Sequence, residues 1–202
     1  AIGFIGVLLN NVDYLIVGRV LGAAALGYYT LAYRMPELVI RTINLGVDRV
    51  AHPILSTLQW DQEQLRSVYR NYLRYTSLAI LPAGVGLAIL SAPIIRIFYS
   101  SEWLASIPVM RWIAIAVMVG ALGHIPGVLY KAINRPDILN KLALIKLPLT
   151  IAILWYGSRW GIVGVALGHV LLAFIKVTLD TVVAGRFVNF GLWQVFKTIS
   201  PA

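Results

Sequence analysis

Four charged residues of one apolar segment recur at a spacing that places them on a single face of a helix. Within residues 23–54 they are Arg34, Glu37, Arg41 and Asp48, at offsets of three, four and seven, and residues so spaced are neighbours on a helix surface. Each charge costs roughly 2.5–3.5 kcal/mol at the centre of a membrane helix. Such a face avoids lipid unless its charges pair or line water. We expect this face to form the wall of a polar cavity.

A second polar group lies in the preceding apolar segment, residues 2–17, where Asn10, Asn11 and Asp13 follow one another closely. Carboxylates within membrane segments pair with other charges or serve ion and substrate pathways. Three interpretations of Asp13 are open: it pairs with an arginine of residues 23–54, it couples an ion, or it contacts a substrate.

Enzyme and metal chemistry have no motif in this sequence. Three histidines are isolated from one another, cysteine is absent, and neither a phosphate-binding glycine loop nor an HExxH motif occurs. We expect His124 and His169 to satisfy contacts between helices, and Lys176 and Asp180, at i and i+4, to neutralise each other. The protein is expected not to be an enzyme and to need no cofactor.

Composition indicates the elements that must position these residues. Apolar residues make up 59% of the 202-residue chain and charged residues 12%, and the mean hydropathy is +0.81. The apolar blocks approach the ~20 helical residues that cross a hydrocarbon core of roughly 30 Å, and backbone groups in lipid require helices because no barrel pattern is present. The fold class is predicted to be all-α, a polytopic transmembrane bundle of about six spanning helices. The expected spans are residues 2–17, 23–54, 76–98, 107–129, 138–156 and 161–184.

The domain prediction is one six-helix lobe over residues 1–185 and an interfacial tail over residues 186–202, leading to a missing segment. The chain starts inside an apolar run without an initiating Met, which indicates a fragment. Residues 61–75 are expected to form an amphipathic helix on the cytoplasmic membrane surface, with Asp61 as its N-cap. Its apolar face is expected to hold Leu65, Val68, Tyr69, Tyr72 and Leu73.

The excess of basic residues indicates membrane orientation rather than nucleic acid binding. Seventeen Lys and Arg residues oppose eight Asp and Glu residues, for a net charge of +9, and cytoplasmic loops of membrane proteins accumulate Lys and Arg. The links after the second and fourth spans are basic. The chain is therefore expected to start on the cytoplasmic side of a bacterial inner membrane, with membrane lipids as partners and no nucleic acid.

The first two spans, NNVDYLIVGRVLGAAALGYYTLAYRMPELV, resemble the start of the C-terminal half of O-antigen, capsule and lipopolysaccharide flippases of the multidrug/oligosaccharidyl-lipid/polysaccharide exporter superfamily. The likeness continues through AHPILSTLQWDQEQLRSVYRNYLR and LYKAINRPDILNKLALI. The resemblance implies one lobe of a two-lobed transporter whose N-terminal lobe is missing. It also implies export of undecaprenyl-pyrophosphate-linked oligosaccharide by alternating access.

In this resemblance the Asp of DYLIVG is Asp13 and the Arg of LAYR is Arg34. The expected substrate-binding residues are Arg34, Arg41, Glu37, Asp48, Asp13 and Asn10. The two arginines are expected to hold the pyrophosphate, because a guanidinium forms bidentate bonds to phosphate and keeps its charge. In the alternative, Glu37 neutralises both arginines and leaves no positive charge for a ligand.

Three rival functions are less consistent with these residues. A drug/cation antiporter of the same superfamily should have an acidic and aromatic cavity rather than one containing two arginines. A membrane polysaccharide polymerase or ligase, which is an enzyme, should have catalytic residues in a large outer loop, and the outer loops here are short. A purely structural subunit would have no use for the charged face.

Overall fold

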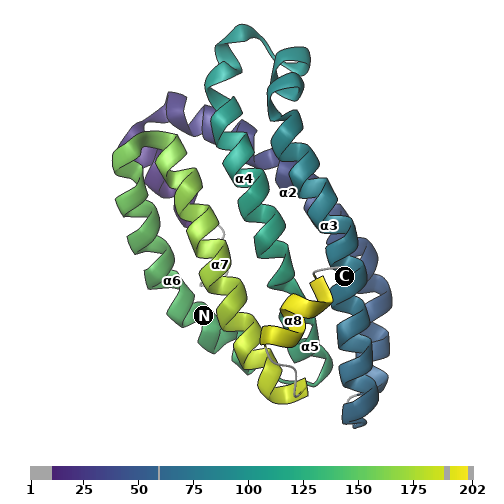
Figure 1. The fold of residues 1–202 in the computed structure, drawn as a ribbon. Helices are drawn as coiled ribbons and strands as arrows, with labels where there is room; N and C mark the ends of the chain where they lie inside the picture. The colour runs from purple at the N-terminus through teal and green to yellow at the C-terminus, as the bar shows by residue number, and fades with distance from the viewer. Residues whose placement is uncertain (1–10, 59, 189–191, 200–202) are drawn as a thin grey trace.

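The computed structural model describes residues 11–58, 60–188 and 192–199 (Figure 1). Asn10 lies outside the described residues, whose regular elements are all helical, so the all-α fold class is confirmed. Residues 11–16 are helical and lead into a π-helical turn, Val17–Leu21. The long helices are α2 (Ala23–Thr57), α3 (Gln62–Phe98), α4 (Ser106–Leu122), α6 (Asp137–Gly157) and α7 (Gly161–Val188). The shorter elements are α5 (His124–Ala132), α8 (Leu192–Ile199) and two 3-10 turns, Ser101–Ala105 and Ser158–Trp160.

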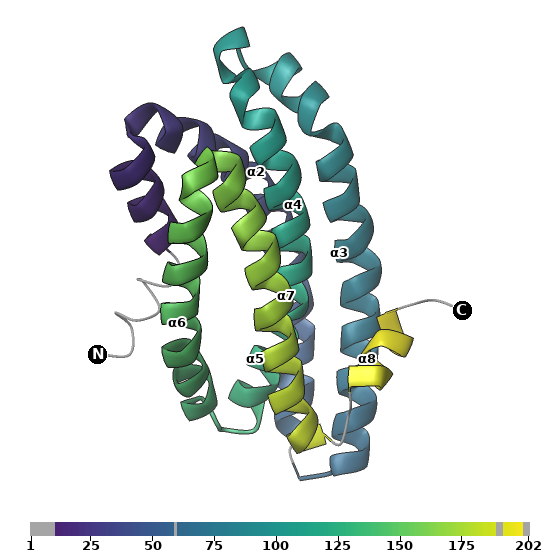
Figure 2. The same ribbon diagram turned by 60° about the vertical axis from the view of Figure 1, so that its left-hand side comes forward.

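The helices form an up-and-down bundle with α4 at its centre (Figures 1 and 2). α4 packs against α2, α3 and α7, and α6 packs on the outer side of α7. The α3–α4 and α6–α7 connections lie at one end of the bundle, here called the α3–α4 end, and the α2–α3 and α5–α6 connections lie at the other, the α2–α3 end. Links that the charge pattern assigns to one side of the membrane therefore share one end of the bundle.

Among the described residues, three segments are long and apolar enough to cross a membrane: Glu63–Phe98, Ser101–Ala132 and Asp137–Val188. The last consists of α6 and α7 joined by a 3-10 turn, so it folds back on itself (Figure 2). α2 is not one of these segments, because its charged face lowers its mean hydropathy. The protein is thus a membrane helical bundle, and the count of six spans stays a prediction.

The amphipathic segment at residues 61–75 differs from its prediction. Asp61 caps the helix as expected, accepting hydrogen bonds from the backbone N–H groups of Glu63 and Gln64 at 3.1 and 3.0 Å. The helix, however, continues without a break to Phe98 and is about 55 Å long at ~1.5 Å per residue. The apolar residues expected on one face, such as Tyr69 and Tyr72, are buried against the bundle. The segment is therefore the first part of α3 and not a separate helix, and its place on the cytoplasmic membrane surface stays a prediction.

Glycine makes the tight α6–α7 hairpin possible. Gly161 has φ of 69°, a left-handed conformation that costs a residue with a side chain about 1–2 kcal/mol. One turn into α7, Gly164 packs directly on the backbone carbonyl of Gly157 in α6, and a Cβ on either glycine would collide with the other. This contact fixes α7 against α6.

The apolar core consists of two large clusters, one towards each end of the bundle, and a third, small cluster around Ile40, Ile80 and Ala121. At the α2–α3 end, Leu55, Tyr69 and Leu129 are members of a cluster built from α2, α3, α5, α6 and α7. At the α3–α4 end, Tyr29 and Ile113 belong to a second cluster. The charged face of α2 lies between these clusters along the helix. The middle of the bundle is therefore where polar side chains can gather.

Candidate functional site

The charged face of α2 lines a cavity, as its spacing predicted. A space of about 490 Å³, here called the α4-side cavity, is bounded by α2, α4, α5 and α7. From α2 it is lined by Glu37, Arg41 and Asp48, and from α7 by His169 and Lys176. Three of the four residues on the predicted face therefore line a cavity, and Arg34 does not.

A second space, the α6-side cavity, lies on the other side of the same residues. It has a volume of about 680 Å³ and is bounded by residues 11–14, α2, α6 and α7. Asp13 lines this cavity, and it shares Tyr33, Glu37, Arg41, His169 and Lys176 with the α4-side cavity. These five residues form the boundary between the cavities, so a ligand in either space meets both Arg41 and Lys176.

The two predicted arginines are placed differently. Arg41 is exposed within both cavities, whereas Arg34 is exposed outside their linings. In the part of the chain that the structure describes, neither arginine forms an ion pair with Glu37. The alternative in which Glu37 neutralises both therefore lacks the contacts that it needs.

Lys176 belongs to the site for a reason that the sequence did not indicate. Its expected partner, Asp180, instead binds the ammonium of Lys146 from α6, and both side chains of that pair are largely buried. The i,i+4 interpretation of Lys176 and Asp180 is wrong, because an ammonium on the neighbouring helix reaches the carboxylate. Among the described residues Lys176 has no hydrogen bond or ion pair and faces the cavities.

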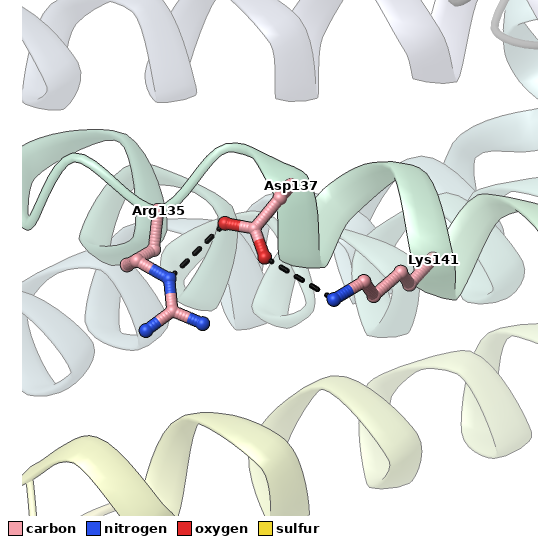
Figure 3. Close-up of polar contacts among 3 residues, drawn as sticks. All are labelled: Arg135, Asp137 and Lys141. Carbon is pink, nitrogen blue, oxygen red and sulfur yellow. Dashed lines mark hydrogen bonds and ion pairs between the residues drawn. The ribbon is translucent and has the colours of Figure 1, made fainter.

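Exposed ion pairs occur elsewhere in the bundle. At the α5–α6 connection, Asp137 accepts hydrogen bonds from Arg135 Nε at 3.1 Å and from Lys141 Nζ at 3.5 Å (Figure 3). All three side chains are well exposed, so water screens this cluster. It lies outside both cavities and offers matched positions for control substitutions.

Asp13 is held by a tyrosine and a histidine rather than by an arginine. The hydroxyl of Tyr29 donates to Asp13 Oδ2 at 2.8 Å and lies 2.8 Å from Nε2 of His169, and that nitrogen is 3.5 Å from the same carboxylate oxygen. The three residues come from the first helical segment, α2 and α7. The arginine pairing considered for Asp13 is replaced by this contact.

Asp48 has the same kinds of partner towards the α2–α3 end. Its Oδ1 accepts a hydrogen bond from the hydroxyl of Tyr72 in α3 at 2.6 Å, and its Oδ2 lies 2.7 Å from Nε2 of His124 in α5. Asp13 and Asp48 thus each accept a hydrogen bond from a tyrosine hydroxyl and have a histidine nitrogen nearby. His124 and His169 satisfy contacts between helices, as predicted: His124 bonds the carboxylate of Asp48, and His169 bonds the hydroxyl of Tyr29.

Sequence reasoning did not assign to the site five residues that shape it: Tyr29, Tyr72, His124, His169 and Lys176. His124, His169 and Lys176 are titratable residues in segments apolar enough to cross a membrane, and this is the one signal that could have drawn attention to them. Tyr29 and Tyr72 lie in helices that carry several charged residues, and no such signal marks them. Their partners could not be found this way, because Tyr29 and His169 are 140 residues apart.

Comparison with curated proteins gives relatives over most of the chain. It is 30% identical to the lipopolysaccharide biosynthesis protein WzxC of Escherichia coli over 87% of its length, and 28% identical to the teichuronic acid biosynthesis protein TuaB of Bacillus subtilis over 84%. It is also 24% identical over 91% of its length to Agl15 of Haloferax volcanii, described as a probable low-salt glycan biosynthesis flippase. The chain covers 36–39% of the length of these relatives. No solved structure matches.

A family model described as polysaccharide biosynthesis protein matches residues 1–108. The matched part includes the first helical segment and α2, with Asp13, Arg41 and Asp48. With helices apolar enough to cross a membrane and a polar cavity between them, the chain belongs to the polysaccharide biosynthesis protein family of membrane proteins.

Proposed function

We propose that this chain is one lobe of a transporter that flips undecaprenyl-pyrophosphate-linked oligosaccharides across the bacterial inner membrane. One observation carries the proposal: Arg41 and Lys176 line both cavities from different helices and have no ion-pair partner among the described residues. Unpaired cations are costly in a membrane protein and mark pathways for charged substrates.

A pyrophosphate group matches this pair of cations. Arg41 supplies a planar fork for bidentate bonds to phosphate oxygens, and Lys176 supplies a mobile point charge. The cavities have room for the phosphates and the first sugars, while the lipid tail stays in the bilayer. Arg34, seven residues before Arg41 on α2, is proposed as a contact at another stage of transport. Glu37, Asp48, Asp13 and Asn10 are proposed as further substrate contacts.

The sugar has an acceptor available in the α4-side cavity. Asn44 lines this cavity, and its side-chain oxygen is buried without a hydrogen-bond partner among the described residues. Leaving a buried acceptor unpaired costs about 1–3 kcal/mol. A sugar hydroxyl that donates to Asn44 would remove this cost.

The cavity gives less support to the rival functions. A cation antiporter needs net negative charge, yet in each cavity two acids face the same two bases, Arg41 and Lys176. Flipping requires no covalent chemistry of the protein, so no catalytic residue is assigned. We also propose six spans, a chain start on the cytoplasmic side and an N-terminal lobe of the same protein that completes the cavity. The basic α5–α6 connection at the α2–α3 end supports this orientation.

The test compares charge removal inside and outside the cavity in the full-length protein, expressed in a strain that lacks its own flippase. Arg41→Ala and Lys176→Ala should abolish glycan export at normal membrane abundance, and Arg41→Lys should impair it strongly because bidentate geometry is lost. Lys141→Ala removes the same charge from the exposed loop cluster and should export at the parental rate.

Surface glycan measured by immunoblot, together with the amount of protein in the membrane, provides the readout. Parental export by both Arg41→Ala and Lys176→Ala would rule out an anion site at this pair. Equal losses in Lys176→Ala and Lys141→Ala would show that export responds to overall charge and not to the cavity.

A further inference from the structure

Asp13 is a buried carboxylate with one oxygen in use and one without a partner. Its exposed fraction is 4%, and Oδ2 accepts the hydrogen bond of Tyr29. Its other oxygen, Oδ1, is buried without a hydrogen-bond partner among the described residues, although the residue lines the α6-side cavity. An ionised carboxylate in this state is costly, and a proton would remove its charge.

The three hydrogen-bonding atoms beside Asp13 have a definite order. The hydroxyl of Tyr29 carries one proton, which it donates to Asp13 Oδ2. Its oxygen can then accept only from a protonated Nε2 of His169, which lies 2.8 Å away. The chain of donors thus runs from His169 through Tyr29 to Asp13, and each heavy-atom separation is within hydrogen-bond distance.

The chain connects the two cavities. His169 lines both of them, and Asp13 lines the α6-side cavity alone. An imidazole has two ring nitrogens, each of which can bind a proton, so His169 offers a path from water in the α4-side cavity to the hydroxyl of Tyr29. The proton then reaches Asp13, which lines the α6-side cavity.

We propose that His169, Tyr29 and Asp13 form a proton relay whose end point is the carboxylate of Asp13. A proton binds the ring nitrogen of His169 that is not bonded to Tyr29. The Nε2 proton passes to the tyrosine oxygen as the tyrosine's own proton passes to Asp13 Oδ2. The imidazole and the phenol end neutral, Asp13 becomes a neutral carboxylic acid, and the charge of the proton has moved from the ring to the carboxyl group.

Other titratable groups facing Asp13 come from its own segment, α2 and α7. They are Tyr14, Tyr33, Glu37, Arg41 and Lys176. The lining contributed by α6, Thr150 and Leu154, does not titrate. With Asp13 ionised, the two acids and two bases in this cavity balance, and with Asp13 protonated the cavity carries one positive charge. This consequence rests on the proposed function: a proton on Asp13 raises the affinity of the site for pyrophosphate.

The test uses infrared difference spectra of the full-length protein in lipid nanodiscs, recorded after a rapid drop in pH and without substrate. The parental protein should show the carbonyl stretch of a protonated carboxylic acid. Asp13→Asn should lose this band, and Asp137→Asn, a matched change at the exposed start of α6, should keep it. Tyr29→Phe retains both end groups but lacks the bridging hydroxyl, so the band should appear at least about tenfold more slowly, which is ~1.4 kcal/mol of barrier.

The relay would be overturned if the band persisted in Asp13→Asn or if it appeared at an unchanged rate in Tyr29→Phe. A band that followed sodium concentration instead of pH would overturn it as well. If Asp13→Asn does not fold, the rate in Tyr29→Phe still decides. Inorganic pyrophosphate binding, measured by calorimetry at two pH values, provides the independent arm. If the parental protein shows the carboxylic acid band but exports no glycan, only the proposed function is contradicted. If it exports glycan normally but shows no band, only the relay is contradicted.

Discussion

Nε2 of His124 lies 2.7 Å from Oδ2 of Asp48, although 76 residues separate them in the chain. The contact ties α5 to the cavity face of α2, and Tyr72 in α3 donates to the other oxygen of the same carboxylate. Asp48 therefore holds three helices together where the cavity meets the apolar cluster at the α2–α3 end.

Replacing Tyr72 with Phe should destabilise the bundle. The change removes the donor to Asp48 and nothing else, and a hydrogen bond to a charged group contributes about 1.5–3 kcal/mol. Denaturant unfolding in detergent should show a loss within this range. Tyr75→Phe makes the same change at an exposed position one turn along α3 and should alter stability by less than about 0.5 kcal/mol. Equal effects of the two substitutions would contradict a role for the Tyr72 bond.

Removing one partner of the buried Lys146–Asp180 pair should lower the free energy of unfolding strongly, whereas replacing both partners should lower it little. Lys146→Met leaves a buried carboxylate without its ammonium, a defect that typically costs about 3–5 kcal/mol. Adding Asp180→Asn removes the stranded charge, so the double variant should recover most of the loss. The matched change Lys141→Met, at an exposed pair, should cost at most about 1 kcal/mol.

Unfolding free energies of the single and double variants provide the measurement for this pair. If Lys146→Met and Lys141→Met lose equal stability, the Lys146–Asp180 pair is not buried in the membrane-embedded protein. A double variant less stable than Lys146→Met would show that Asp180 has a second partner on which stability depends.

Gly164→Ala should weaken the α6–α7 hairpin, because the new methyl group meets the carbonyl of Gly157 and the side chain of Trp160. Overpacking of this kind costs about 1–3 kcal/mol. Gly86→Ala adds the same methyl group to α3 where no atom lies within 4 Å, and it should leave stability unchanged or raise it slightly. Thermal aggregation in detergent distinguishes the two, and a Gly164→Ala protein as stable as the parent would refute the close helix contact.

The orientation can be tested with single cysteines, because this part of the protein has none. The structure offers the exposed positions Trp60, on the α2–α3 connection, and Ser101, at the start of the α3–α4 connection. Ser158, on the α6–α7 connection, is unsuitable for labelling because it is buried. With other cysteines of the full-length protein replaced, an impermeant thiol reagent added to intact cells should label Ser101→Cys and spare Trp60→Cys. The reverse pattern would invert the proposed topology.

Local features of this protein were predictable, and partners distant in sequence were not. The Asp61 cap depends on neighbours within one helical turn, and the cavity wall on α2 depends on helical periodicity, so both were found from spacing. Asp180 illustrates the limit. The i,i+4 rule offered Lys176 as its partner, but Lys146, 34 residues earlier, competes for the carboxylate once α6 packs on α7. Periodicity assigns faces to helices and does not say which faces meet.

The amphipathic part of α3 shows the same limit at the level of whole elements. Its apolar face was identified correctly from the spacing of residues such as Leu65 and Tyr69, both of which are buried. Such a face can lie on lipid or on protein, and the pattern is the same in both cases. The choice depended on the presence of α5 and α7 beside it.

The charged face of α2 also affects how the protein is made. During synthesis α2 leaves the ribosome before α3 and α4, and it is not among the segments apolar enough to cross a membrane by composition. We therefore expect α2 to be retained in the bilayer only once the apolar α4, which packs against it, has arrived from the translocation machinery. Substitutions that loosen the α2–α4 contact should therefore lower the amount of protein in the membrane, because chains in which α2 has not integrated are degraded. The transport rate of each assembled molecule should change less.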